Sequence, residues 1–160
     1  MVIPKIKCVL YTTDLSENST YAFRYAVNTT EKHDAEMIVL HVLEEIPASI
    51  RAYTDMVSFR DKLDETRKDA AMEKLSRRLD EFCESELRER PECLKRIRRT
   101  RVIEGYPVDV ILKIADEESC DIIIMGTHGK GIITHTFLGS VAERVLRRTR
   151  KPVFVIPLPD

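Results

Sequence analysis

The chain has 160 residues, of which 43% are hydrophobic and 33% charged, and its formal net charge is −1. This length and balance predict a single globular domain over residues 1–160 rather than a disordered chain. The near-neutral charge argues against a dedicated nucleic-acid-binding protein, and no apolar run is long enough for a membrane helix, so neither partner is expected.

The cysteines indicate the compartment. They stand at positions 8, 83, 93 and 120 without a CxxC pair, which argues against a zinc site or a thioredoxin-type motif. Cys8 and Cys120 each open an apolar run, so we interpret both as small core residues. No apolar stretch of signal-peptide type follows Met1. A reducing cytoplasm is the expected location, and no metal ligands are predicted.

Five short segments predict strands. Apolar runs without polar alternation are typical of central parallel strands, and they cover residues 8–11, 37–43, 122–125 and 153–156. A basic run at 97–103 predicts a charged strand at a sheet edge. The alternative for this run is a nucleic-acid patch, which the lack of interleaved aromatic residues disfavours.

Helical spacing separates these strands. The first helix is expected to place Tyr21, Ala22, Tyr25 and Ala26 on one face, with Asp14 and Glu17 as a capping box or Ser16 as the cap. Residues 47–57 read as a loop. Residues 58–90 predict a charged helix that Pro91 ends, with an apolar stripe. The stripe is Leu63, Ala70, Ala71, Leu75, Leu79 and Phe82.

Two further helices are predicted, one that Pro107 opens and that carries Val108, Ile111, Leu112 and Ala115, and one over residues 140–148. Strands and helices therefore alternate from end to end. This alternation predicts an α/β fold with a parallel sheet, right-handed crossovers and helices on both faces.

The candidate site lies where strands end, because parallel sheets bind ligands at the carboxyl ends of their strands. The first strand ends in Thr12, Thr13 and Asp14, and the fourth runs from Met125 into residues 126–131. Four of the five glycines lie between positions 126 and 139, where they could adopt positive φ or admit a ligand. Residues 139–140 open a helix whose amino end favours phosphate.

The alternative is a plain glycine turn, although a dozen residues without secondary structure are uncommon unless they are functional. Neither GxxxxGK[ST] nor GxGxxG is present, which disfavours a P-loop nucleotidase and a nicotinamide dehydrogenase.

The spacing Gly126, two residues, Gly129, nine residues, Gly139-Ser140 resembles the ATP-binding signature of the universal stress protein (UspA) family. Residues 9–16, 40–42 and 152–156 also resemble strands of that family. The resemblance covers essentially the whole chain. It implies a three-layer, Rossmann-like domain of the adenine nucleotide alpha hydrolase type, with a five-stranded parallel sheet in the order 3-2-1-4-5.

The resemblance also implies residue roles. Asp14 would contact the ribose or adenine, and the main chain at Val42 would recognise adenine. Gly126 and Gly129 would let the nucleotide lie against the loop, while the amides of Gly139, Ser140 and Val141 would bind phosphates. The other expected site residues are Thr12, Thr13, Met125, Thr127, His128 and Lys130. Some relatives have Pro where this chain has Thr13.

Three functions remain open at this point. The first is a nucleotide-binding stress-response switch that takes ATP, or ADP or AMP, with Mg²⁺ held through the phosphates. The second is a slow ATPase or phosphotransferase, although no catalytic residue is predicted. The third is a nucleotide-independent module that dimerises through an edge strand, as the resemblance also implies. That strand would be Val153, Phe154, Val155 and Ile156.

The histidines carry weaker expectations. His41 is interpreted as a hydrogen-bonded core residue, His128 as an exposed loop residue that steers phosphate together with Lys130, and His135 as a surface residue.

Overall fold

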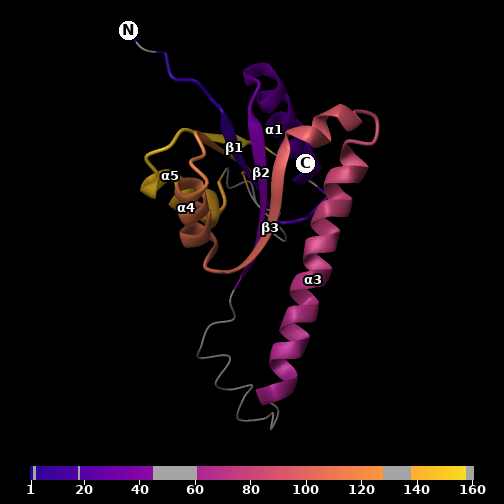
Figure 1. The fold of residues 1–160 in the computed structure, drawn as a ribbon. Helices are drawn as coiled ribbons and strands as arrows, with labels where there is room; N and C mark the ends of the chain where they lie inside the picture. The colour runs from indigo at the N-terminus through magenta and orange to yellow at the C-terminus, as the bar shows by residue number, and fades with distance from the viewer. Residues whose placement is uncertain (2, 18, 45–60, 128–137, 158–160) are drawn as a thin grey trace.

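A computed structural model of the chain describes residues 1, 3–17, 19–44, 61–127 and 138–157, with the side chains of residues 61–67 left aside. Five parallel strands form one sheet in the order β3-β2-β1-β4-β5, which confirms the predicted fold class and strand order (Figure 1). The elements are β1 (Cys8–Thr13), α1 (Ser19–His33), β2 (Glu36–Glu44), α3 (Asp61–Glu86), η1 (Pro91–Arg96), β3 (Ile97–Gly105), α4 (Pro107–Glu117), β4 (Ile122–Gly126), α5 (Ser140–Arg148) and β5 (Val153–Ile156).

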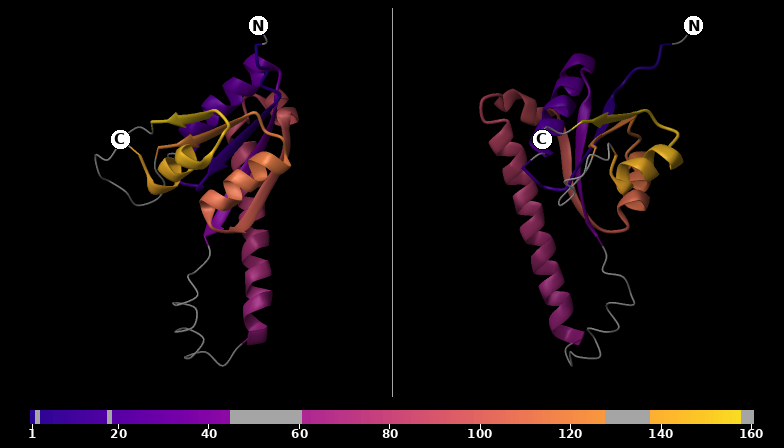
Figure 2. Two further views of the ribbon diagram at one scale, coloured as in Figure 1. Left: turned by 90° about the vertical axis from the view of Figure 1, so that its left-hand side faces the viewer. Right: turned by 180° about the vertical axis from the view of Figure 1, so that it is seen from behind.

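Both faces of the sheet are covered. Figure 2 shows α1 and α3 on one side of the sheet and α4 and α5 on the other. Successive side chains of a strand point to opposite faces, so Val9 and Tyr11 pack in the α1–α3 layer while Cys8 and Leu10 pack in the α4–α5 layer. This double burial explains why the strands read as continuous apolar runs.

The strand registers leave a hollow at one end of the sheet. The pairing of β1 with β2 runs from Cys8↔Glu36 to Thr13↔His41. The pairing of β1 with β4 ends earlier, at Tyr11↔Ile124. Strands β1 and β4 therefore diverge two residues before β1 ends. This is the point where the strand order reverses, and ligands bind there in open α/β sheets.

Helix α3 differs from its predicted course at its carboxyl end. It ends at Glu86 rather than at Arg90, and Pro91 begins the 3₁₀ helix η1 instead of ending α3. The steric effect of a proline on the preceding residue explains why Arg90 is non-helical, with a φ of −138°. The residues predicted at 58–60 and the loop at 47–57 lie outside the described residues.

The predicted stripe of α3 is buried only in part. Leu79 is fully buried and Leu75 and Phe82 are partly buried, but Ala70 and Ala71 are exposed. The reason is visible in Figures 1 and 2, where the amino-terminal half of α3 extends beyond the sheet. A helical stripe is buried only where another element covers it. The Leu63 side chain is not among those that the structure describes.

Helix α1 corrects two further predictions. Its buried face is formed by Ala22, Phe23, Ala26 and Val27, whereas Tyr21 and Tyr25 are exposed and pack edge to face on each other. The expected capping is also wrong, because α1 begins only at Ser19.

The cause of the later start lies in the backbone. Leu15 has a φ of 58°, which no right-handed helix admits, so Asp14 cannot cap a helix there. The Ser16 hydroxyl donates to Asp14 rather than capping α1.

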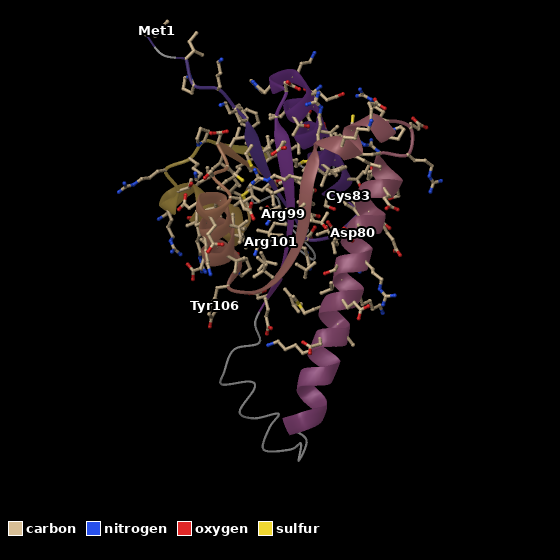
Figure 3. The ribbon with its side chains drawn as sticks, in the orientation of Figure 1. Met1, Asp80, Cys83, Arg99, Arg101 and Tyr106 are labelled. Carbon is tan, nitrogen blue, oxygen red and sulfur yellow. The ribbon has the colours of Figure 1, made fainter. Side chains whose placement is uncertain are left out.

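Strand β3 forms one edge of the sheet, as its charge predicts. Its pairing with β2 skips Arg98, which marks a bulge. The bulge lets Arg98, Arg99 and Arg101 all reach the carboxylate of Glu118, with distances of 2.9, 3.3 and 3.1 Å. Figure 3 shows Arg99 and Arg101 on the side of β3 away from α3. The arginines therefore cross-link β3 to the end of α4.

The hydropathy of the helices bears on whether any of them could span a membrane. Among the helices that the structure describes, none is both long and apolar enough to cross a membrane.

Candidate functional site

A pocket of about 440 Å³ opens at the carboxyl ends of β1, β2 and β4, which is a size typical of small-molecule sites. All ten predicted site residues within the described chain line it. They are Thr12, Thr13, Asp14, Val42, Met125, Gly126, Thr127, Gly139, Ser140 and Val141. The remaining three, His128, Gly129 and Lys130, lie outside the described residues, as does His135.

One wall of the pocket is apolar. Leu40 and Val42 of β2 face the same layer as Ile111 of α4, and Pro107 begins that helix beside them. The side chain of Met125 reaches the pocket from β4. A flat, mostly apolar group can bury its faces against such a wall, because removing apolar surface from water is favourable.

The acidic group of the pocket is held in place. Oδ1 of Asp14 accepts two hydrogen bonds from Ser16, one from the main-chain amide at 3.1 Å and one from the hydroxyl at 2.7 Å. Thr13 fixes the same turn, since its Oγ1 accepts from the amide of Leu15 at 3.0 Å. The carboxylate therefore lies at the pocket with a restricted orientation, which lowers the entropic cost of binding a ligand hydroxyl.

Helix α5 supplies the opposite end of the pocket. Gly139 is its N-cap, with a φ of −70°, and its amide donates to the carbonyl of Thr127 at 2.6 Å. The first turn of the helix contains Ser140, Val141 and Ala142, all of which line the pocket. Amides in a first helical turn lack acceptors within the helix and carry the positive end of its dipole. This end can bind an anion.

The positive φ expected for glycines of the predicted loop is tested only at Gly126 and Gly139, because Gly129 and Gly131 lie outside the described residues. Within the described residues the glycine with positive φ is Gly105, at 152°, and it stands at the end of β3 rather than in the predicted loop. At position 139 the backbone would suit any residue. A glycine there leaves space for a ligand to approach the backbone, which is the second of the two roles considered from the sequence.

The first strand is anchored to its neighbours beside the pocket. The hydroxyl of buried Tyr11 donates to the carbonyl of Ser19 at 2.7 Å, and burial raises the pKa of Tyr11 well above its usual value. His41 Nδ1 lies 2.9 Å from the carbonyl of Thr13 and donates to it. His41 is thus hydrogen-bonded, as expected, although it is only partly buried.

Eight lining residues were not predicted. They are Tyr11, Ser19, Ala22, Leu40, Glu44, Pro107, Ile111 and Ala142. The sequence contains a signal for some of them, because residues two before a predicted site residue on a strand share its face, as Leu40 does with Val42. The contribution of α4 depends on which helix lies over the hollow, and local patterning does not contain that information.

Comparison with known proteins agrees with this architecture. The model of the universal stress protein family matches residues 5–157. Universal stress protein MJ0577 of Methanocaldococcus jannaschii is 32% identical over 153 residues, which cover 94% of each chain.

Two solved structures extend the comparison. One, described as a structure-based assignment of the biochemical function of MJ0577, superposes with a TM-score of 0.76 and 28% identity, and covers 98% of this chain and 99% of that chain. A universal stress protein in complex with cAMP shares the fold, with a TM-score of 0.56, 22% identity and coverage of 96% and 98%. The chain therefore belongs to the universal stress protein family.

Proposed function

We propose that this protein binds an adenine nucleotide, preferably ATP, in the pocket at the carboxyl ends of β1, β2 and β4. Through this binding it acts as a nucleotide-dependent switch in a stress response. The observation that carries the proposal is the meeting of ten predicted site residues, distant in the sequence, around one pocket of suitable size. ADP and AMP share the same base and sugar and are the closest competitors.

The adenine and ribose fit the β2 side of the pocket. The β1–β2 ladder ends at Thr13↔His41, whereas β2 continues beside β3 to Glu44↔Gly105. The edge of β2 that faces β1 is therefore open to a ligand from Val42 onward. Main-chain groups there can pair with the polar edge of adenine while the apolar wall covers its faces. Asp14, held by Ser16, can accept a hydrogen bond from a ribose hydroxyl.

The phosphates fit the α5 side of the pocket. The amides of Ser140 and Val141, with the exposed Ser140 hydroxyl, supply donors at the positive end of the helix. No group of three potential metal ligands occurs among the residues that the structure describes. A bound Mg²⁺ would therefore be carried by the phosphates, where it would neutralise part of their charge.

Binding is favoured over catalysis. Hydrolysis needs a positioned nucleophile and groups that stabilise charge on the transferred phosphoryl group. Asp14 is engaged by Ser16 in a position suited to recognition. A slow ATPase or phosphotransferase is the alternative, and phosphate release from Mg²⁺–ATP under single-turnover conditions distinguishes the two.

The proposal is tested by calorimetric titration of the nucleotide-free protein with Mg²⁺–ATP. Micromolar binding is expected for the natural chain. Val141→Glu places a negative charge at the phosphate end and should lower the affinity at least tenfold, since like charges repel in a partly desolvated site. Leu146→Glu is the matched control, because it adds the same charge at an exposed position of the same helix. Absence of binding by the folded natural chain would refute the proposal.

A second candidate function is homodimerisation through β5. This strand is a sheet edge that pairs with β4 alone in the described sheet, and its Phe154 side chain is 44% exposed. A short apolar edge is stabilised by pairing with another strand, and a two-fold partner would supply one. Val155→Glu should raise the monomer fraction in analytical ultracentrifugation. An unchanged monomer fraction would exclude this interface.

The cellular location is a further part of the proposal. We propose that the protein works in the cytoplasm, where ATP and a reducing environment are both present. Fractionation of cells that express the natural chain would test this.

A further inference from the structure

Two cysteines meet at the end of the sheet opposite the pocket. Cys8 begins β1, and Cys120 lies in the turn between α4 and β4. Their Sγ atoms are 3.0 Å apart, and the residues are 5% and 1% exposed. Both are free thiols. The sulfur atoms are separated by only about 1 Å more than the length of a disulfide bond.

The backbone holds the two residues together. The amide of Asp121 donates to the carbonyl of Cys8 at 2.8 Å, and Oδ2 of Asp121 accepts from the amides of Lys7 at 2.7 Å and Cys8 at 2.9 Å. Both cysteines pack in the α4–α5 layer of the core. Their side chains therefore point to the same face, one from the start of β1 and the other from the turn that precedes β4, and the sulfur atoms can approach further without a change of fold.

We propose that Cys8 and Cys120 form an oxidation site that hydrogen peroxide converts to an intramolecular disulfide. The Cys8 thiolate attacks one oxygen of the peroxide, the O–O bond breaks, and the products are a sulfenic acid on Cys8 and a hydroxide that takes a proton to become water. The Cys120 sulfur then attacks the sulfenic sulfur. The S–S bond forms, the S–O bond breaks, and the second water leaves with the Cys120 proton. Two thiols lose two electrons, and one peroxide is reduced to two waters.

The groups around the two thiols shift the pKa of Cys8 and the pKa of Cys120 in opposite directions. Either sulfur can donate in the hydrogen bond between the two thiols, and when Cys120 donates, the bond lowers the pKa of Cys8. The nearby Arg98 charge lowers this pKa too, while burial opposes both effects. The same hydrogen bond, together with burial, raises the pKa of Cys120. Arg98 is kept near by its ion pairs with Glu36 and Glu118. The lowered pKa of Cys8 and its greater exposure, 5% against 1% for Cys120, favour Cys8 as the attacking sulfur and Cys120 as the thiol that resolves the sulfenic acid.

The other two cysteines serve as internal controls. Burial raises the pKa of Cys83 to about 12. Burial raises the pKa of Cys93, and so does Glu31, whose Oε1 accepts a hydrogen bond from the Cys93 thiol at 3.5 Å. Both remain protonated near neutral pH and are poor nucleophiles.

The site is separate from the proposed nucleotide pocket, because the pair lies at the amino ends of the strands and the pocket at their carboxyl ends. The inference therefore does not rest on nucleotide binding. A disulfide would join positions 112 residues apart. Cross-linking across so long a loop restricts the unfolded chain, so the oxidised protein should have a higher thermal midpoint than the reduced one.

The test uses the full chain, first reduced and freed of reductant, then treated with hydrogen peroxide, unfolded, alkylated and mapped by mass spectrometry. The expected result is a linked pair of peptides that contain Cys8 and Cys120, formed at least tenfold faster than oxidation of Cys83 or Cys93. The double variant Cys83→Ser, Cys93→Ser should form the same link. Cys120→Ala should stop at a sulfenic acid on Cys8, which dimedone traps.

Two results would overturn the proposal. One is free Cys8 and Cys120 in the natural chain after Cys83 and Cys93 have been oxidised. The other is a link between Cys8 and Cys120 that forms only after the protein has been unfolded, because proximity in the fold would then have no role.

Discussion

The two ends of β1 differ, although the strand is buried along most of its length. At the amino end, the Asp121 carboxylate accepts hydrogen bonds from the amides of Lys7 and Cys8, and the thiol of Cys8 contacts that of Cys120. At the carboxyl end, β1 diverges from β4 after Tyr11, and a pocket opens. One strand can thus form a closed, hydrogen-bonded frame at one end and the wall of an open pocket at the other, because strand order reverses beside it.

The largest expected effect is at the open end. Asp14→Asn removes the negative charge but keeps the shape, and we expect ATP affinity to fall roughly ten- to a hundredfold, or about 1.5–3 kcal/mol. Calorimetry of the nucleotide-free variant measures this. Asp34→Asn makes the same change far from the pocket, at a position whose φ of 51° asparagine tolerates, and should leave the affinity unchanged. Equal losses in both variants would contradict the assignment of Asp14.

The matching change at the closed end should affect stability instead. Asp121→Ala leaves the amides of Lys7 and Cys8 without their carboxylate acceptor, and we expect a loss of about 1–3 kcal/mol in the free energy of unfolding. Urea titration measures it. Asp116→Ala is the control, since that carboxylate is largely exposed and makes one ion pair with Lys151. Unchanged stability in Asp121→Ala would argue that the amino end of β1 is not held by this carboxylate.

A backbone change at the carboxyl end of β3 should cost somewhat less. A Cβ on Gly105 would lie 2.8 Å from Cγ2 of Val110, and the φ of 152° disfavours other residues. Gly105→Ala should destabilise the fold by about 1–2 kcal/mol. Val110→Ala in the same chain should recover some of this loss, because it removes the clash while the backbone strain remains. An additive double variant would show that the clash is not the cause.

The smallest effect is expected where a side chain only orients another. Ser16→Ala removes the hydroxyl that donates to Asp14 but keeps the amide that donates to the same oxygen. ATP affinity should fall about three- to fivefold, or roughly 0.6–1 kcal/mol. In the background of Asp14→Asn, the Ser16 change should have no further effect. A full independent loss there would mean that Ser16 acts on the ligand directly.

The sequence predicted the sheet well, because burial on both faces leaves continuous apolar runs at β1, β2, β4 and β5, and β5 has the predicted bounds of Val153–Ile156. It predicted the site residues by their place at strand ends and by the glycine spacing. Ten of these residues lie together, although their role in binding stays a prediction.

The wrong or missing predictions concern features that depend on tertiary contacts. The face of α1 depends on what α3 and the sheet cover, so Tyr21 and Tyr25 were misplaced. The start of α1 depends on the φ of Leu15, which no pattern marks. The contact of Cys8 with Cys120 joins residues 112 positions apart and depends on the pairing of β1 with β4, which local patterning does not contain.

We expect adenine nucleotide to bind at the open end of β1 and not elsewhere. Backbone amide NMR of the 18.5 kDa chain, titrated with Mg²⁺–ATP, compares both ends in one experiment. We predict large shift changes at Thr13, Val42 and Val141, and none at Cys8 or Asp121. Shift changes confined to the closed end would contradict binding at the open end. The same holds if a protein prepared without nucleotide shows no shift changes at saturating ATP.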